Sequence, residues 1–81
     1  MSVTYFVALP FIGSEEGPVP AEAVECPNEG AALLKAEAMS RKEGVVGSLA
    51  FKRTGNPNEG SFGEPTILRT FGVVPENLDE L

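Results

Sequence analysis

Only one stretch of this sequence, residues 28–43, has the pattern of an amphipathic helix. Asn28 follows Pro27, and its side chain can accept a hydrogen bond from a free backbone N–H of the first helical turn. Gly44 fits the position just after the last turn, where glycine adopts a left-handed conformation at little cost. A chain of 81 residues with one helix must build the rest of its core from strands, so the sequence predicts an α+β fold.

The predicted helix has one face of small residues. Steps of 100° per residue place most of the charged side chains on one side and collect small and apolar ones in an arc opposite. That arc is formed by Ala32, Leu33, Ala36, Met39 and Ser40. Small side chains let a helix approach a sheet closely, so we expect this arc to be buried. Leu34 and Ala38 fall on the polar side, where they are exposed or contact a partner.

Four extended segments surround the helix. Alternating apolar residues predict strands at residues 3–11, 45–53 and 66–74. Residues 19–26 alternate weakly and contain Pro20, which predicts an edge strand or an extended segment. Pro10 has no N–H and is expected to end the pairing of the first strand. Residues 54–65 are rich in turn formers and predict one long hairpin loop.

These segments together predict a small antiparallel sheet of three or four strands, in the order β-β-α-β-β, with the helix packed on one face. We expect a single α+β domain over residues 1–75 and an acidic tail over residues 76–81. In the last strand, the alternation places Arg69 on the same face as Ile67, Phe71 and Val73.

One helix cannot cover both faces of such a sheet, so we expect an open face with apolar side chains. Large exposed apolar patches usually mark interfaces. The leading prediction is therefore a non-catalytic interaction module, either a homodimer or an accessory subunit of another protein. The candidate interaction residues are Tyr5, Phe6, Phe51, Lys52, Arg53, Arg69 and Phe71.

The first alternative is a nucleic-acid-binding protein, and the net charge of −6 argues against it. An acidic chain repels DNA, RNA and anionic lipid at long range. Five of the six cations nevertheless lie between Lys35 and Arg53, so a local basic patch remains open. Lys52 and Arg53 follow Phe51, and Arg69 lies on a neighbouring strand. RNA-binding sheets combine strand aromatics and cations in this way, so the alternative is a nucleic-acid-binding protein.

A second alternative, a small enzyme, depends on Cys26. The sequence has no histidine, which rules out Ser-His-Asp and Cys-His arrangements and His-ligated zinc. Cys26 lies two positions before the expected helix cap, where a helix dipole stabilises a thiolate. No imidazole is available as its base, so we predict no enzyme and no catalytic residue. Asn56, Asn58 and Glu59 offer too few carboxylates for calcium, and we expect no metal and no cofactor.

Three features predict a cytoplasmic protein. Cys26 is the single cysteine, so no internal disulfide can form, which suits a reducing compartment. The N-terminal residues lack the basic region of a signal peptide. The longest apolar run, residues 6–12, is far shorter than the ~20 residues that a membrane-spanning helix needs, so we expect no membrane association.

Four stretches resemble a family of short bacterial proteins of unassigned function. They are YFVALPF at residues 5–11, ECP at 25–27, AFKRTGNP at 50–57 and FGVVP at 71–75. The resemblance implies a bacterial, free-standing protein. It implies no activity, so no functional residue follows from it.

Overall fold

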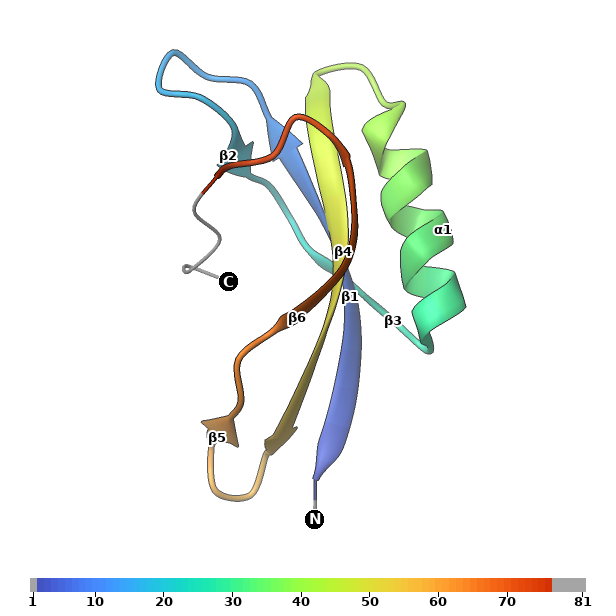
Figure 1. Ribbon diagram of the computed structural model, residues 1–81, viewed down its shortest axis with the longest axis vertical. Coiled ribbons are helices and arrows are strands. Elements are labelled where there is room, and N and C mark those ends of the chain that lie inside the picture. Colours follow the sequence, from blue (N-terminus) through green and yellow to red (C-terminus); the bar gives the residue numbers. More distant parts are fainter. Residues whose placement is uncertain (1, 77–81) are drawn as a thin grey trace.

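Two long antiparallel strands, β1 (Val3–Ile12) and β4 (Val45–Asn56), form the centre of the sheet. The structure is a computed structural model, in which residues 2–76 are described. The remaining elements are β2 (Val19–Pro20), β3 (Val24–Cys26), α1 (Glu29–Ser40), β5 (Ser61–Phe62) and β6 (Thr66–Gly72) (Figure 1). Over the described residues the protein therefore has one helix and an antiparallel sheet, and the prediction of an α+β fold is confirmed.

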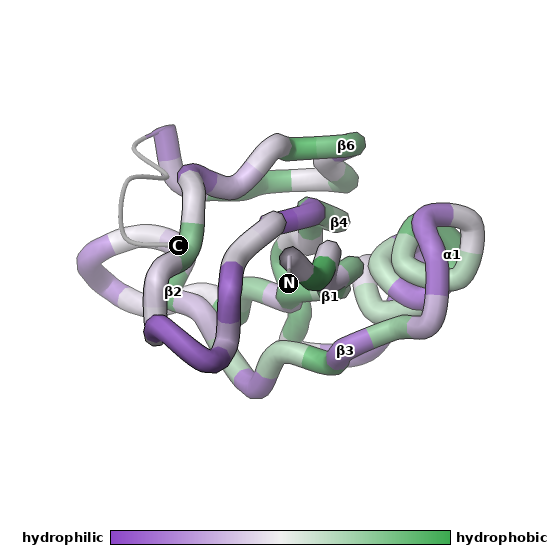
Figure 2. The backbone as a smooth tube through the Cα atoms, turned by 90° about the horizontal axis from the view of Figure 1, so that it is seen from below, coloured by the Kyte–Doolittle hydropathy of each residue, from purple (hydrophilic) through white to green (hydrophobic). Residues whose placement is uncertain are grey.

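In the described part of the chain the sheet has six strands, because each outer strand is divided into two pieces. β2 and β3 both pair with β1 at one edge, and β5 and β6 both pair with β4 at the other. The predicted β-β-α-β-β order with three or four strands is thus matched only roughly. Seen along its long axis, the curled sheet has α1 packed on one side (Figure 2).

Pro10 lies within β1, opposite the gap between β2 and β3, and it does not end β1. Its carbonyl accepts a hydrogen bond from the backbone N–H of Ala21 at 2.9 Å. Because the N–H and C=O of a strand residue point to the same side, the missing N–H also lies on this edge. Pairing with β4 is unaffected and continues to Ile12, so the predicted end of pairing at Pro10 is wrong.

The helix begins as predicted and ends earlier. The Asn28 side chain accepts a hydrogen bond from the Ala31 N–H at 2.8 Å, which confirms the expected cap. The helix ends at Ser40, before the predicted end at residue 43, because the chain tightens into i→i−3 hydrogen bonds from the N–H groups of Arg41 and Lys42. Gly44 has the predicted left-handed conformation, with φ of 87°, but it lies three residues past the Arg41 cap and is not the residue directly after the helix, as was predicted.

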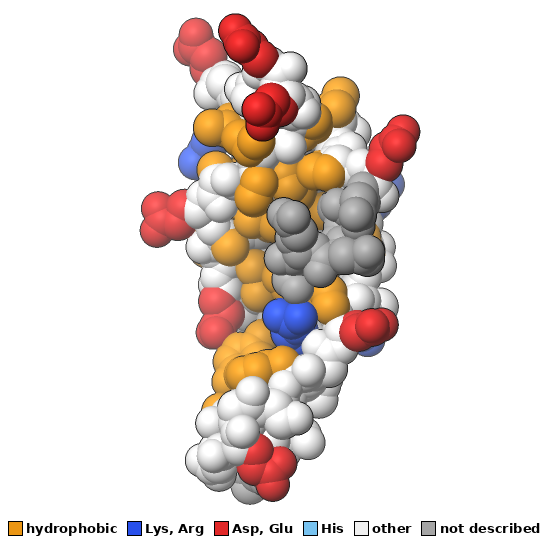
Figure 3. All heavy atoms as spheres, turned by 90° about the vertical axis from the view of Figure 1, so that its left-hand side faces the viewer, with side chains coloured by type: hydrophobic (Ala, Val, Ile, Leu, Met, Phe, Trp, Pro, Cys, Tyr) orange, Lys and Arg blue, Asp and Glu red, His pale blue; other side chains and the backbone are white. Residues whose placement is uncertain are grey.

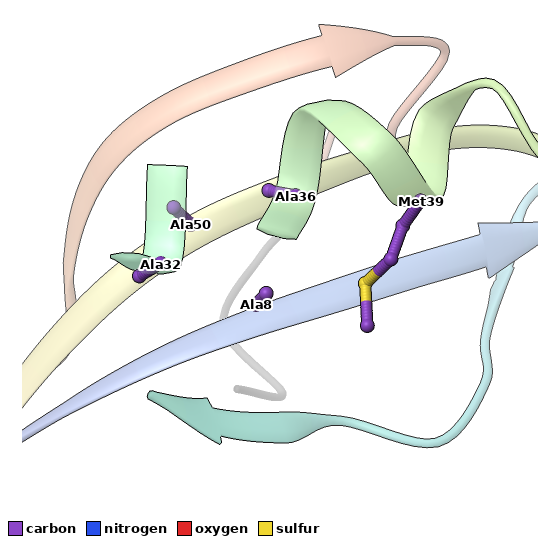
Figure 4. Packing of buried hydrophobic residues seen from close by; sticks show 5 residues of the cluster. All are labelled: Ala8, Ala32, Ala36, Met39 and Ala50. Atoms are coloured by element: carbon purple, nitrogen blue, oxygen red, sulfur yellow. The ribbon is translucent and has the colours of Figure 1, made fainter. Parts of the chain in front are cut away.

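The helix packs on the sheet through alanines. Ala32 and Ala36 of α1 meet Ala8 and Ala50 of the two central strands, and all four are fully buried (Figure 4). Met39 fills the space near the end of the helix. The buried small-residue arc is therefore confirmed, and Leu34, 71% exposed, lies on the outer side.

The opposite face of the sheet has larger side chains. Leu9 and Phe11 of β1 and Leu49 and Phe51 of β4 form its buried cluster. Partly buried Val7, Ile67 and Val74 pack against this cluster. Since these residues alternate along β1 and β4 with the alanines that face α1, the central strands have apolar residues on both faces.

A bulge in β6 changes the face of its C-terminal half. Ile67 pairs with Phe51, Arg69 pairs with Ala50, and the register shifts between these two pairs. Leu68 is the extra residue, so Ile67 lies on the face opposite α1 while Arg69 and Phe71 lie on the helix side. The prediction that Ile67, Arg69 and Phe71 share a face is therefore wrong.

The predicted long loop at residues 54–65 is largely a hairpin. β4 continues to Asn56, and β5 pairs with it through Gly55–Phe62 and Asn56–Ser61. The Asn56 carbonyl and side chain accept hydrogen bonds from the N–H groups of Glu59 and Asn58, which closes the turn. The predicted acidic tail at 76–81 lies outside the described residues, apart from Glu76.

Candidate functional site

The structure divides the seven candidate interaction residues between the two faces of the sheet. The face opposite α1 has Tyr5, Phe51 and Arg53. The helix side has Phe6, Lys52, Arg69 and Phe71. This division follows from the period of two along each strand, together with the bulge in β6.

The three residues opposite α1 line a shallow depression of about 320 Å³. Its other lining residues are Val7, Glu25 and Phe62. Figure 3 shows this side of the molecule, where hydrophobic side chains gather along the length of the sheet. The depression is the candidate site, because it combines aromatic rings with one carboxylate and one guanidinium on a face that the helix does not cover.

Phe62 of β5 is the most exposed aromatic side chain of the depression. Its ring centroid lies 5.9 Å from that of Tyr5, with a tilt of 50° between the rings, and 47% of the residue is exposed. The ring lies against Gly55 of β4, where a Cβ would stand only 2.3 Å from Phe62 Cδ1. The glycine therefore leaves the space in which the Phe62 ring rests.

Phe62 is not among the predicted interaction residues, because residues 54–65 were expected to form a loop. The pair of turn residues Asn56 and Gly60 is the signal in the sequence that indicates a hairpin here. Gly60 has φ of 66°, a conformation that favours glycine. A turn between these two residues returns the chain antiparallel to β4 and places Phe62 beside Gly55.

Two charged residues flank the apolar centre of the depression. Glu25, on β3, is exposed and pairs with Val7 of β1. Arg53, on β4, pairs with Tyr5 of β1, and its Nε donates a hydrogen bond to the carbonyl oxygen of Gly63 at 2.8 Å. Because β1 runs between β3 and β4, the carboxylate and the guanidinium lie on opposite flanks of the site.

On the helix side, the aromatic candidates belong to the packing against α1. Phe6 and Phe71 are partly buried against the alanine cluster. The guanidinium carbon of Arg69 lies 5.5 Å from the centroid of the Phe71 ring, a cation–π contact. Phe6 and Phe71 therefore lie on the helix side of the sheet and not on the face opposite α1.

Cys26 lies at the end of β3 and is partly buried against the alanine cluster. Its Sγ donates a hydrogen bond to the Val24 carbonyl at 3.6 Å. Within residues 2–76, no three His, Cys, Asp or Glu side chains lie close enough together to hold a metal ion. The thiol is thus a packed side chain beside the helix.

The helix α1 has 12 residues, and within residues 2–76 no helix has the length and apolar character needed to cross a bilayer. Comparisons with protein-family models, with curated proteins and with solved structures find no match to this chain.

Proposed function

We propose that this protein is a non-catalytic interaction module of the cytoplasm that forms a homodimer through the sheet face opposite α1. The observation that carries the proposal is the aromatic depression of Tyr5, Phe51 and Phe62. Large aromatic side chains dominate the energetics of interfaces, since each buries about 150–250 Å². An exposed Phe62 ring beside Tyr5 is the kind of anchor that a second protein surface would cover.

The charges around the depression favour a second copy of this chain as the partner. In a face-to-face dimer with its two-fold axis along β1, the flanks of the two copies exchange positions. Arg53 of one copy then lies opposite Glu25 of the second copy, and the reverse. A surface with a negative charge on one flank and a positive charge on the other is complementary to a second copy of itself. Binding to a different protein would not require this self-complementarity.

The size of the chain also supports association. Small domains bury a lower fraction of their surface, and cores of this size rarely provide more than ~3–5 kcal/mol. Covering further apolar area contributes ~25 cal/mol per Å², from which the cost of association must be subtracted. A weak dimer, with a dissociation constant in the range of tens to hundreds of micromolar, is therefore the expected state.

The placement of the cations argues against the nucleic-acid alternative. Lys52 and Arg69 lie on the helix side, whereas Arg53 lies on the opposite face beside Tyr5. No single sheet face therefore combines all three cations, and the chain as a whole has a net charge of −6. Phe6 and Phe71 lie beside Lys52 and Arg69, but both rings are partly buried against the alanine cluster under α1.

Sedimentation equilibrium on three proteins tests the dimer. The wild-type chain is expected to show a monomer–dimer equilibrium at hundreds of micromolar, with the dimer fraction rising with concentration, and Phe62→Ser is expected to remain a monomer. Leu34→Ser is the matched control, because Leu34 is the most exposed large hydrophobic residue among residues 2–76 and lies on the outer side of α1. It is expected to dimerise like the wild type. A monomeric wild type would contradict the homodimer and leave the accessory subunit, while loss of dimer in Leu34→Ser alone would place the interface on the helix.

Charge exchange tests the proposed geometry separately. Glu25→Arg and Arg53→Glu are each expected to weaken dimerisation, because each variant places like charges opposite one another. The double variant restores opposite charges and is expected to recover the dimer. Circular dichroism of each variant establishes that the fold is retained. If the double variant were as weak as the single ones, the two-fold arrangement would be wrong even if the face is correct.

A further inference from the structure

A second depression lies between the end of α1 and the β2–β3 edge of the sheet. It has a volume of about 270 Å³. Its lining residues are Pro10, Ala21, Glu22, Val24, Lys35, Met39, Lys42 and Val45. None of these residues lines the depression at Tyr5 and Phe62, so the two sites are separate.

The groove exists because the edge strand is interrupted opposite Pro10. Residues 21–23 connect β2 and β3 without pairing along β1, apart from the hydrogen bond from the Ala21 N–H to the Pro10 carbonyl. A continuous edge strand would fill the space beside the helix. The interruption instead leaves Met39 and Val24 as apolar walls of an open groove.

Two lysines give the groove its charge. Lys35 and Lys42 are spaced by seven residues and share the side of α1 that has Met39, with Lys42 just past the helix end. Both lysines are exposed, and neither forms an ion pair with a carboxylate of residues 2–76, although the chain is acidic overall. Glu22 stands on the other wall.

We propose that this groove binds a small amphiphilic carboxylate, with its apolar body against Met39 and Val24 and its carboxylate at Lys35 and Lys42. The opposite wall has Glu22, which repels a second negative charge and so favours a single carboxylate at one end of the ligand. Pockets for drug-sized ligands have volumes of about 300–1,000 Å³. A groove of about 270 Å³ suits a shorter ligand, such as a medium-chain fatty acid.

Titration with octanoate, followed by two-dimensional NMR of the labelled protein, tests this site. Saturable shifts are expected for the amides of residues 21–24 and 39–45. Octan-1-ol has the same apolar body without the charge, and is expected to bind several-fold more weakly. Absence of saturable shifts, equal binding of octan-1-ol, or shifts concentrated at Tyr5 and Phe62 would each overturn the proposal.

Variants with the same change in charge supply the control. Lys35→Gln and Lys42→Gln are each expected to weaken octanoate binding about two- to fivefold, the range for an exposed charge pair. Arg41→Gln removes one positive charge from the residue next to Lys42. It is expected to leave binding unchanged, since Arg41 pairs with Glu37 and does not line the groove. If Arg41→Gln and Lys42→Gln weakened octanoate binding equally, net charge alone would explain the effect, and the proposed binding site in the groove would be wrong.

Discussion

The Ser48 hydroxyl donates a hydrogen bond to the backbone carbonyl oxygen of Ala36, which joins β4 to the middle of α1. Among the residues that the structure describes, Ser48 is the one polar side chain in the buried core. A buried hydroxyl is costly unless it is hydrogen-bonded. The bond therefore satisfies the hydroxyl and fixes the position of the helix along the strand, in the middle of an otherwise apolar contact.

Ser48→Ala is expected to lower the free energy of unfolding by about 0.5–1.5 kcal/mol, the usual net contribution of one hydrogen bond. Urea denaturation measures the change. Ser61→Ala is the control, because Ser61 is exposed on β5, and its effect is expected to stay within about 0.5 kcal/mol. Equal stability of Ser48→Ala and the wild type would show that the bond does not hold the helix.

Ala36→Leu is expected to cost about 1–3 kcal/mol, because a larger side chain overpacks the close contact between helix and sheet. Ala36 is fully buried against the strands, whereas Ala38 of the same helix is exposed. Ala38→Leu makes the same chemical change on the outer side and is expected to leave the urea midpoint nearly unchanged. Similar midpoints for the two variants would contradict the assignment of the buried face.

Gly55→Ala is expected to displace Phe62 and with it the aromatic anchor of the dimer. The new Cβ would lie 2.3 Å from Phe62 Cδ1 and 2.7 Å from the Ser61 carbonyl oxygen, so the ring or β5 must move. NMR shifts of the Tyr5 ring would report the loss of the 5.9 Å ring pair. Gly30→Ala is the contrasting variant. Its Cβ meets nothing closer than 3.5 Å, so it is expected to stabilise the protein by about 0.4–1 kcal/mol.

Cys26 is expected to react slowly with a thiol reagent at pH 7. The side chain is partly buried, its Sγ donates a hydrogen bond to the Val24 carbonyl oxygen, and the sequence has no histidine to act as a base. The rate should rise in urea, which exposes the thiol. Labelling of the folded protein at pH 6 as fast as in urea would indicate an activated thiolate and return attention to the enzyme alternative.

Local chemistry made much of this fold predictable. The Asn28 cap, the small-residue face of α1 and the alternation of β1 each follow from residues near one another in the sequence. The bulge at Leu68 was not predictable in this way, because the register between β4 and β6 is decided by pairing across the sheet. That single extra residue moved Arg69 and Phe71 to the helix side.

The candidate site shows the same limit. Phe51 and Arg53 share a face by the period of two, which the sequence contains. Their meeting with Tyr5 depends on the antiparallel register of β1 and β4. Phe62 enters the site only because β4 continues to Asn56 and turns back there. No apolar alternation marks a strand of two residues, so only the turn residues Asn56 and Gly60 indicated its place in the sequence.

The divided outer strands have a consequence for how this protein behaves at high concentration. Fibril growth needs an uninterrupted row of free backbone groups on which the next strand can form. One edge is interrupted at residues 21–23, and the other is broken between β5 and β6 and bulged at Leu68. Within residues 2–76, neither edge of the sheet therefore offers a long template, and at high concentration the molecules are expected to associate through their sheet faces and not as ordered fibres.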